Sequence, residues 1–142
     1  FQHVPTGKEI YFKAFIDATL TYQHNSGTWY QVTDLGNREG NYLEASGTAM
    51  LTYAMAKGAS LKFLPEEYKA HAEKGFAGLL DQMISVNPDT NVISLEQVCA
   101  VAGLGGNPYR DGSFDYYMSE PIRANDAKGV GPFILAAHYL NK

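Results

Sequence analysis

The side chains best suited to acid–base chemistry in this chain of 142 residues are the carboxylates of Asp34, Glu44, Asp111, Asp115, Glu120 and Asp126. Cleavage of a glycosidic bond usually needs two carboxyl groups that face each other across a sugar. Spacing along the chain does not select such a pair. Glu44 also suits the third position of a helix-capping box, and Asp126 suits a turn or a helix cap. Catalytic and structural roles therefore both stay open for these two residues.

Signatures of other chemistries are absent from the sequence. The four histidines are isolated, with no pair at helical i,i+4 spacing, so neither a metal nor another cofactor is predicted. Residues 103–106 (GLGG) are followed by neither Lys-Ser/Thr nor a predicted helix, which argues against a phosphate-binding loop. Ser46 lies outside a nucleophile elbow, and Cys99 has no adjacent His or Lys. We expect Cys99 to be an inert buried thiol.

One long stretch, Cys99 to Phe133, has too much Gly, Pro, Asn and Asp for a predicted helix. Loops of this length inside a compact domain are usually functional. Its glycines permit sharp turns or a close approach to a ligand. Its aromatic and charged residues suit a sugar ring, or equally a loop folded over its own core; they include Tyr109, Arg110, Phe114, Tyr116, Tyr117, Arg123 and Lys128.

Length and composition favour one globular domain with a real core, since 45% of the 142 residues are hydrophobic. The net charge of −4, without a long basic run, argues against nucleic acid or an anionic membrane as partner. No apolar run approaches the roughly 20 residues of a membrane span. The single cysteine fits a reducing compartment. Because the chain begins with Phe1, without an initiator Met or a signal-peptide pattern, we expect a processed chain or a piece of a longer one.

Four helices are predicted from capping signals and apolar residues at helical spacing. The first opens in a capping box at Thr6 and runs from about 7 to 23. The second has Asn41 at its N-cap and Glu44 three residues on, and Gly58 follows its end. The third runs from Pro65 to about Ser85, and the last opens with Pro132 in its first turn. Residues 28–32, 92–95 and 98–101 resemble short strands. Two helical hairpins with irregular segments at one end are expected.

A series of motifs resembles the C-terminal part of the unsaturated rhamnogalacturonyl hydrolases, glycoside hydrolase family 105, which are relatives of the unsaturated glucuronyl hydrolases. The motifs occur in order at 29–32 (WYQV), 41–46 (NYLEAS), 53–58 (YAMAKG), 102–106 (AGLGG), 112–117 (GSFDYY), 120–121 (EP) and 125–133 (NDAKGVGPF). Each motif alone is weak, but the series is specific and covers nearly the whole chain.

The resemblance implies an all-α fold, in which residues 1–142 form a single C-terminal portion of an (α/α)6 barrel. The partner of this portion would be the missing N-terminal part of the barrel. The exposed cut faces would also allow a homo-oligomer. Members of the family occur in the cytoplasm and in the periplasm; we expect the cytoplasm, with the periplasm as the alternative.

The resemblance also implies an activity for the parent protein. The family removes 4,5-unsaturated galacturonic acid from the non-reducing end of pectin fragments. An Asp protonates C4 of the enol ether, water adds at C5, and the hemiketal opens to expel the aglycone, normally rhamnose. This Asp and a second pocket Asp lie in the N-terminal half of the family. No residue here inherits the catalytic role, and the chain alone is expected to be inactive.

What this chain would contribute is a wall of the substrate pocket. A short strand could stack on or bond the sugar, or only pack against helix ends. Lys128, beside Gly129 and Gly131, could meet a uronate carboxylate at a helix N-terminus, or be a solvated loop lysine. The candidate substrate-binding residues are Trp29, Tyr30, Gln31, Glu44, Arg110, Asp126 and Lys128. The rival hypotheses are a non-catalytic carbohydrate-binding or interaction module, and a structural helical domain whose loop residues are buried.

Overall fold

The computed structural model describes residues 7–142, so Thr6 of the predicted capping box lies outside the described residues. The helices are α1 (Gly7–Leu20), α2 (Ala45–Ser60), α3 (Tyr68–Gln82), α4 (Phe114–Ser119) and α5 (Ala127–Leu140), with a 3-10 turn η1 (Thr33–Leu35). The strands are β1 (Trp29–Tyr30), β2 (Leu43–Glu44), β3 (Ile84–Val86), β4 (Ile93–Leu95), β5 (Val98–Cys99) and β6 (Ile122–Arg123). Within the described chain, no helix is long and apolar enough to cross a membrane.

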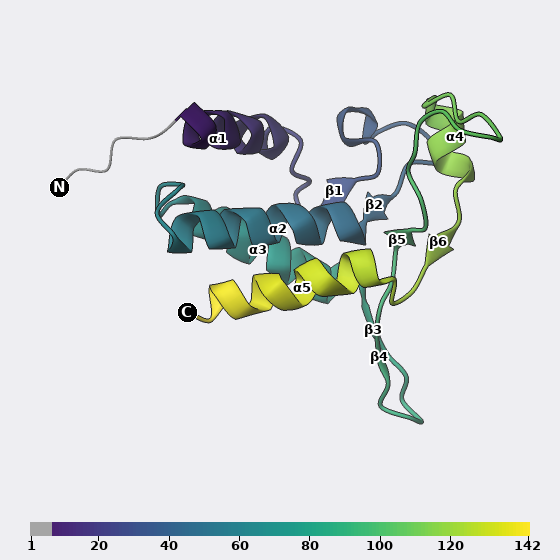
Figure 1. Ribbon diagram of the computed structural model, residues 1–142. Coiled ribbons are helices and arrows are strands. Elements are labelled where there is room, and N and C mark those ends of the chain that lie inside the picture. Colours follow the sequence, from purple (N-terminus) through teal and green to yellow (C-terminus); the bar gives the residue numbers. More distant parts are fainter. Residues whose placement is uncertain (1–6) are drawn as a thin grey trace.

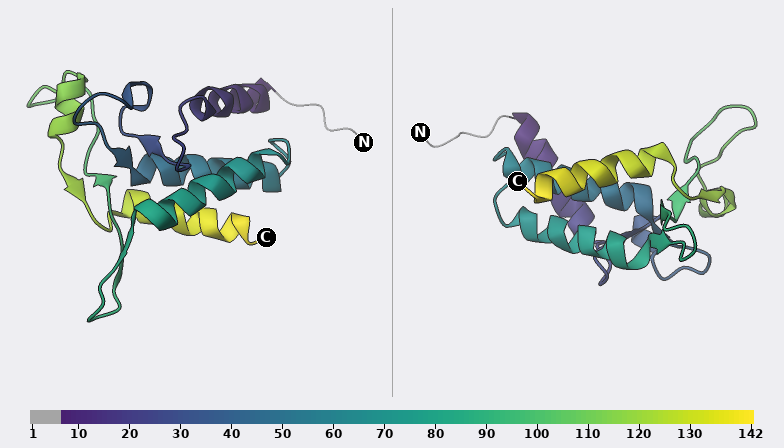
Figure 2. Two further views of the ribbon diagram at one scale, coloured as in Figure 1. Left: turned by 180° about the vertical axis from the view of Figure 1, so that it is seen from behind. Right: turned by 90° about the horizontal axis from the view of Figure 1, so that it is seen from below.

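Helix α2 is the centre of the helical layer, since it packs against both α3 and α5 while α1 lies on its other side (Figures 1 and 2). One core cluster joins Ile16 of α1 and Met55 of α2 to Tyr68 of α3. A second joins Ala49 of α2 and Leu79 of α3, with Val130 and Phe133 of α5 packed against it. The expected all-α class, with four principal helices, is confirmed.

The strands form three two-stranded antiparallel ribbons, β1–β2, β3–β4 and β5–β6. The β3–β4 ribbon projects away from the helices (Figure 1). Its first strand was predicted as the end of the third helix, which stops at Gln82 instead. The reason is that Ile84 and Val86 alternate with Ser85 and pair with β4, and Asn87 closes the turn by accepting bonds from the next backbone N–H groups.

Several helix starts and ends differ from the sequence prediction, and α2 continues past Gly58 to Ser60. The first helix ends at Leu20 because the following residues wind as tighter turns, in which the Gln23 N–H donates to the Leu20 carbonyl. The second begins after Glu44, which is itself the N-cap. Asn41 is not the cap because its amide bonds the carbonyls of Val32 and Leu35 in the preceding loop.

The segment 99–133 is more structured than its composition suggested. It contains α4, whose N-cap Ser113 accepts a bond from the Tyr116 N–H, and the strand β6. Helix α5 begins at Ala127 rather than near Pro132, because Asp126 is the N-cap and its side chain accepts the Lys128 N–H in the first turn. Pro132 therefore lies inside the helix, where it removes one backbone hydrogen bond.

The contact between α3 and the loop before β1 requires glycine. A Cβ added at Gly78 would overlap the Ser26 carbonyl oxygen and lie 2.8 Å from Cγ2 of Thr28. Backbone atoms cannot move aside as a flexible side chain can, so this approach holds α3 against the 24–28 turn.

We expect Gly78→Ala to lower the free energy of unfolding by about 1 to 3 kcal/mol, the usual cost of overpacking. The matched control is Gly131→Ala in α5, where an added Cβ meets nothing within 4 Å. That change should raise stability by up to about 1 kcal/mol, because alanine favours a helix. Urea denaturation of the two variants and the parent chain measures both effects. Equal destabilisation by the two changes would contradict the assignment.

Candidate active-site wall

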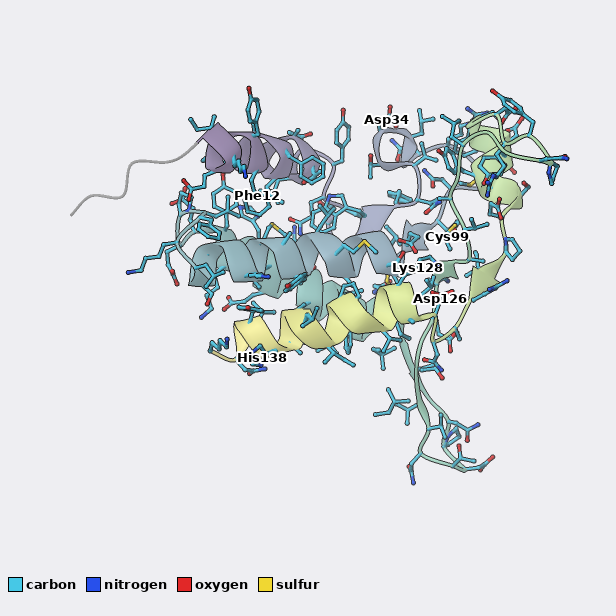
Figure 3. All side chains as sticks on the ribbon, viewed as in Figure 1. Phe12, Asp34, Cys99, Asp126, Lys128 and His138 are labelled. Atoms are coloured by element: carbon cyan, nitrogen blue, oxygen red, sulfur yellow. The ribbon has the colours of Figure 1, made fainter. Side chains whose placement is uncertain are left out.

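The functional candidates gather at one end of the helical layer. The N-termini of α2 and α5 meet the β1–β2 and β5–β6 ribbons there, and Cys99, Asp126 and Lys128 lie close together in this region (Figure 3). This arrangement follows from the chain path, because each of the two helices begins directly after a segment that crosses this end.

Glu44 occupies the centre of this end, with only 4% of its surface exposed. Its Oε1 accepts bonds from the Ser46 hydroxyl at 2.7 Å and from the Cys99 backbone N–H at 2.9 Å. Its Oε2 accepts the Gly47 backbone N–H at 2.6 Å, which makes Glu44 the N-cap of α2. The carboxylate therefore joins the start of α2 to strand β5.

Cys99 is surrounded by polar side chains. Its Sγ lies 3.3 Å from Nε2 of Gln31 and 3.1 Å from the Val101 carbonyl oxygen. The buried Tyr42 hydroxyl lies beside this thiol but has no partner at hydrogen-bonding geometry. Burial raises the pKa of Tyr42, with the thiol and the Glu44 carboxylate adding to the effect. The expected buried thiol is confirmed.

Lys128 and Asp126 form an ion pair at the start of α5. Lys128 Nζ lies 3.2 Å from Asp126 Oδ2 and donates to the Ala100 carbonyl at 3.0 Å. Asp126 Oδ1 also accepts the Lys128 backbone N–H at 3.1 Å, so the predicted alternative of a helix cap is confirmed. That N–H and then the Lys128 side chain hold the pKa of Asp126 below its ordinary value.

Arg110 is held by the glycine-rich loop. The Gly105 and Arg110 backbones exchange two hydrogen bonds, and Arg110 Nε donates to the Gly105 carbonyl at 3.1 Å. An added Cβ at Gly103 or Gly106 would come within 3.0 Å of the guanidinium, so these glycines let the loop wrap around it. The loop remains open elsewhere, since Leu104 and Tyr109 are 72% and 76% exposed.

Trp29 and Tyr30 pair with Glu44 and Leu43 in the β1–β2 ribbon, but their side chains have other partners. The Trp29 ring is buried in the helical core, and its Nε1 donates to the Thr19 carbonyl at 2.7 Å. Tyr30 is half-buried and packs edge-on against His24 at 5.5 Å between ring centres. The structure therefore brings Gln31 and Glu44 together through their contacts with Cys99, and it pairs Asp126 with Lys128. The roles of all seven candidates in substrate binding stay predictions.

The other carboxylates have local partners or are exposed. Asp111 accepts the Ser113 backbone N–H at 2.8 Å, and this bond is the main cause of its lowered pKa. Asp115 lies 3.4 Å from Arg38, whose guanidinium stacks on the Phe114 ring. Among residues 7–142, no group of three or more His, Cys, Asp or Glu side chains could hold a metal ion.

Three contributors escaped the sequence analysis. Tyr42 lies inside the 41–46 motif, but nothing in the sequence marks its phenol as buried. Ala100 and Arg38 carried no motif signal, because the first acts through its backbone and the second pairs across 77 positions. The sequence analysis placed Glu44 at the third position of the capping box, whereas Glu44 is itself the N-cap of α2.

Comparison with known families identifies relatives across nearly the whole chain. The family model described as Glycosyl Hydrolase Family 88 matches residues 8–142. Two curated relatives are each 42% identical over 123 residues: Protein Atu3128 of Agrobacterium fabrum and the 24.9 kDa protein in picA locus of Rhizobium radiobacter. The match covers 82% of this chain and 52% of each relative, so the chain spans about half their length.

Solved structures share the fold. A family 105 glycoside hydrolase of C. acetobutylicum is 46% identical with a TM-score of 0.87, over 94% of this chain and 38% of that one. A possible family 105 member from Klebsiella pneumoniae has a TM-score of 0.71 at 24% identity, over 97% of this chain and 34% of that one. The fold is thus that of part of these larger enzymes, as the motif series predicted.

The Asp126 carboxyl should titrate below its ordinary value of 3.8. Because the folded pKa is the lower one, its contribution to stability is present above about pH 4 and is lost as the pH falls through the lowered pKa. Lys128→Met should move this pKa only part of the way back, since the backbone N–H is kept. NMR titration of the carboxyl carbon tests this, and a midpoint above 3.8 in the parent chain would contradict it.

Proposed function

Because the chain belongs to glycosyl hydrolase family 88, we propose that it is part of a glycoside hydrolase that acts on unsaturated uronic sugars. The proposed substrate is a pectin-derived rhamnogalacturonan oligosaccharide with 4,5-unsaturated galacturonic acid at its non-reducing end. The observation that supports this most is the similarity to a family 105 glycoside hydrolase, at 46% identity and a TM-score of 0.87.

The proposed reaction is hydration of the enol ether. An Asp outside this chain protonates C4, water adds at C5, and the hemiketal opens to release the aglycone. Two of the candidate carboxylates support this proposal, because Glu44 and Asp126 are already engaged by neighbouring donors or a cation. The chain alone is accordingly inactive in this proposal.

The role proposed for this chain is to bind the uronate through Lys128. An ammonium group has three N–H donors. Two are used on the Ala100 carbonyl and on Asp126, and the side chain is 34% exposed. The third is available to a carboxylate, and Arg123 adds positive charge nearby, since it also helps to lower the pKa of Asp126.

The proposed partner is the remaining part of an α/α barrel. Helix α1 packs inward through Ile16 and Phe12 but exposes Tyr11 and Phe15, which are 79% and 58% accessible. A helix that is apolar on opposite faces is usually covered on both. At the other edge, Ile134 of α5 is 60% exposed. The cytoplasm is the proposed compartment.

A second candidate function is a carbohydrate-binding module without hydrolysis. The observation that favours it is the exposed Tyr109, because an accessible aromatic face can stack on a sugar. The same exposure counts against a structural domain with a buried loop.

The chain alone should release no unsaturated galacturonate from such an oligosaccharide, yet should bind it. Lys128→Met should weaken binding about tenfold or more, the usual effect of losing a hydrogen bond to a charged group. Lys8→Met, at the far end of α1, is the matched control and should bind as the parent does. Calorimetry measures affinity, and loss of the enol-ether absorbance measures hydrolysis. Hydrolysis by the chain alone, or equal binding by both variants, would overturn the assignment.

Phe15→Glu should reduce self-association of the chain, because it places a charge on the apolar outer face of α1. Its free energy of unfolding should change by only about 0.5 kcal/mol, as for other surface substitutions. Ala70→Glu adds the same charge on an exposed position of α3 and should leave association unchanged. Light scattering during gel filtration over a concentration series measures the association of each variant. If the parent chain is monomeric at every concentration, the proposal that the outer face of α1 seeks a partner is wrong.

A further inference from the structure

Glu44 is a buried carboxylate without a cation. It is 4% exposed, and none of the ion pairs found between described side chains includes it. Such a charge is costly unless donors surround it. Here the donors are all neutral, two backbone N–H groups and one hydroxyl, and the N-terminus of α2 adds its favourable dipole.

We infer that Glu44 is a positioning residue, whose carboxylate fixes strand β5 against α2 and thereby sets the place of the Lys128 ammonium. The path is short. The Cys99 N–H donates to Glu44 Oε1 at 2.9 Å, and the next residue, Ala100, accepts the bond from Lys128 Nζ at 3.0 Å. One peptide unit therefore separates the anchor from the ammonium.

Other bonds hold the same strand but do not replace this anchor. The Ala45 N–H donates to the Gln97 carbonyl at 2.9 Å, before β5 begins. The Ala100 N–H donates to the Pro121 carbonyl at 2.8 Å, which ties β5 to β6. Only the bond from Cys99 connects β5 itself to the start of α2 among the bonds found in residues 7–142.

Glutamate suits this position better than its closest analogues. The two oxygens accept from opposite partners, β5 on one side and Gly47 on the other. Glutamine would turn an amide N–H₂ toward one of these donors, leaving that pair unsatisfied. Aspartate is shorter by one methylene, so it could cap α2 but would not reach Cys99. Burial and negative charge also make Glu44 a poor ligand for a uronate.

The inference rests on the proposed uronate site at Lys128, so it is tested with and without a ligand. Glu44→Gln should weaken binding of the unsaturated oligosaccharide about fivefold at a temperature where the variant is fully folded. In a Lys128→Met background the same change should have less than about a twofold effect, as expected for coupled residues. Ser46→Ala is the matched control, because it removes a donor to the same carboxylate but leaves the Cys99 bond. It should lower stability without changing affinity.

Hydrogen exchange by NMR gives the ligand-free measurement. Glu44→Asp, which does not reach Cys99, should speed exchange of the Cys99 amide about tenfold or more and shift the Lys128 side-chain resonances, whereas Ser46→Ala should do neither. Glu44→Gln is the second variant, and it should speed exchange of either the Cys99 or the Gly47 amide, because its carbonyl can accept from only one side. If the parent chain binds no oligosaccharide, the proposed uronate site is wrong. Hydrogen exchange of the Cys99 amide then still tests whether Glu44 holds β5 in place. Unchanged Cys99 exchange in Glu44→Asp, or equal effects in the Ser46 variant, would overturn the positioning role.

Discussion

The close packing of α2 is the constraint on which the rest of the structure depends. Its buried positions are occupied by small residues, among them Ala45, Ala49, Thr52, Ala56 and Gly58. Small side chains let α3 and α5 approach α2 closely, and a Cβ added at Gly75 of α3 would overlap the Thr52 hydroxyl of α2. Because α3 and α5 are fixed relative to α2, their ends are fixed too, and the segments that connect them meet at one place.

The end of the layer that carries the proposed binding residues is built on this packing. The start of α2 carries Glu44, the start of α5 carries Asp126 and Lys128, and β5 crosses between them. The hydrogen bond that the Cys99 N–H donates to Glu44 and the one that Lys128 donates to the Ala100 carbonyl make one continuous connection across this end. A site on helix ends is better preorganised than one on a free loop. The glycine-rich loop around Arg110 extends from this connection.

The two edges of the layer are unlike its centre. Apolar side chains are exposed on the outer face of α1 and on α5, while the interior is densely packed. The solved family 105 glycoside hydrolase shares this fold over 38% of its own chain. The layer is thus arranged like a segment of a larger helical ring, with its polar functional groups at one end and its apolar surfaces at the sides.

The sequence by itself determined the helical class, the family resemblance and most of the helix positions, because apolar spacing and capping residues are local signals. It also indicated the helix-capping alternative for Asp126. It did not reveal that Glu44 bonds Cys99 across 55 positions, that Trp29 is buried, or that part of the Gly-rich stretch forms α4 and the start of α5. Those outcomes depend on which surfaces face each other after folding. A carboxylate and a backbone N–H far apart in the chain carry no mutual signal until tertiary packing places them 2.9 Å apart.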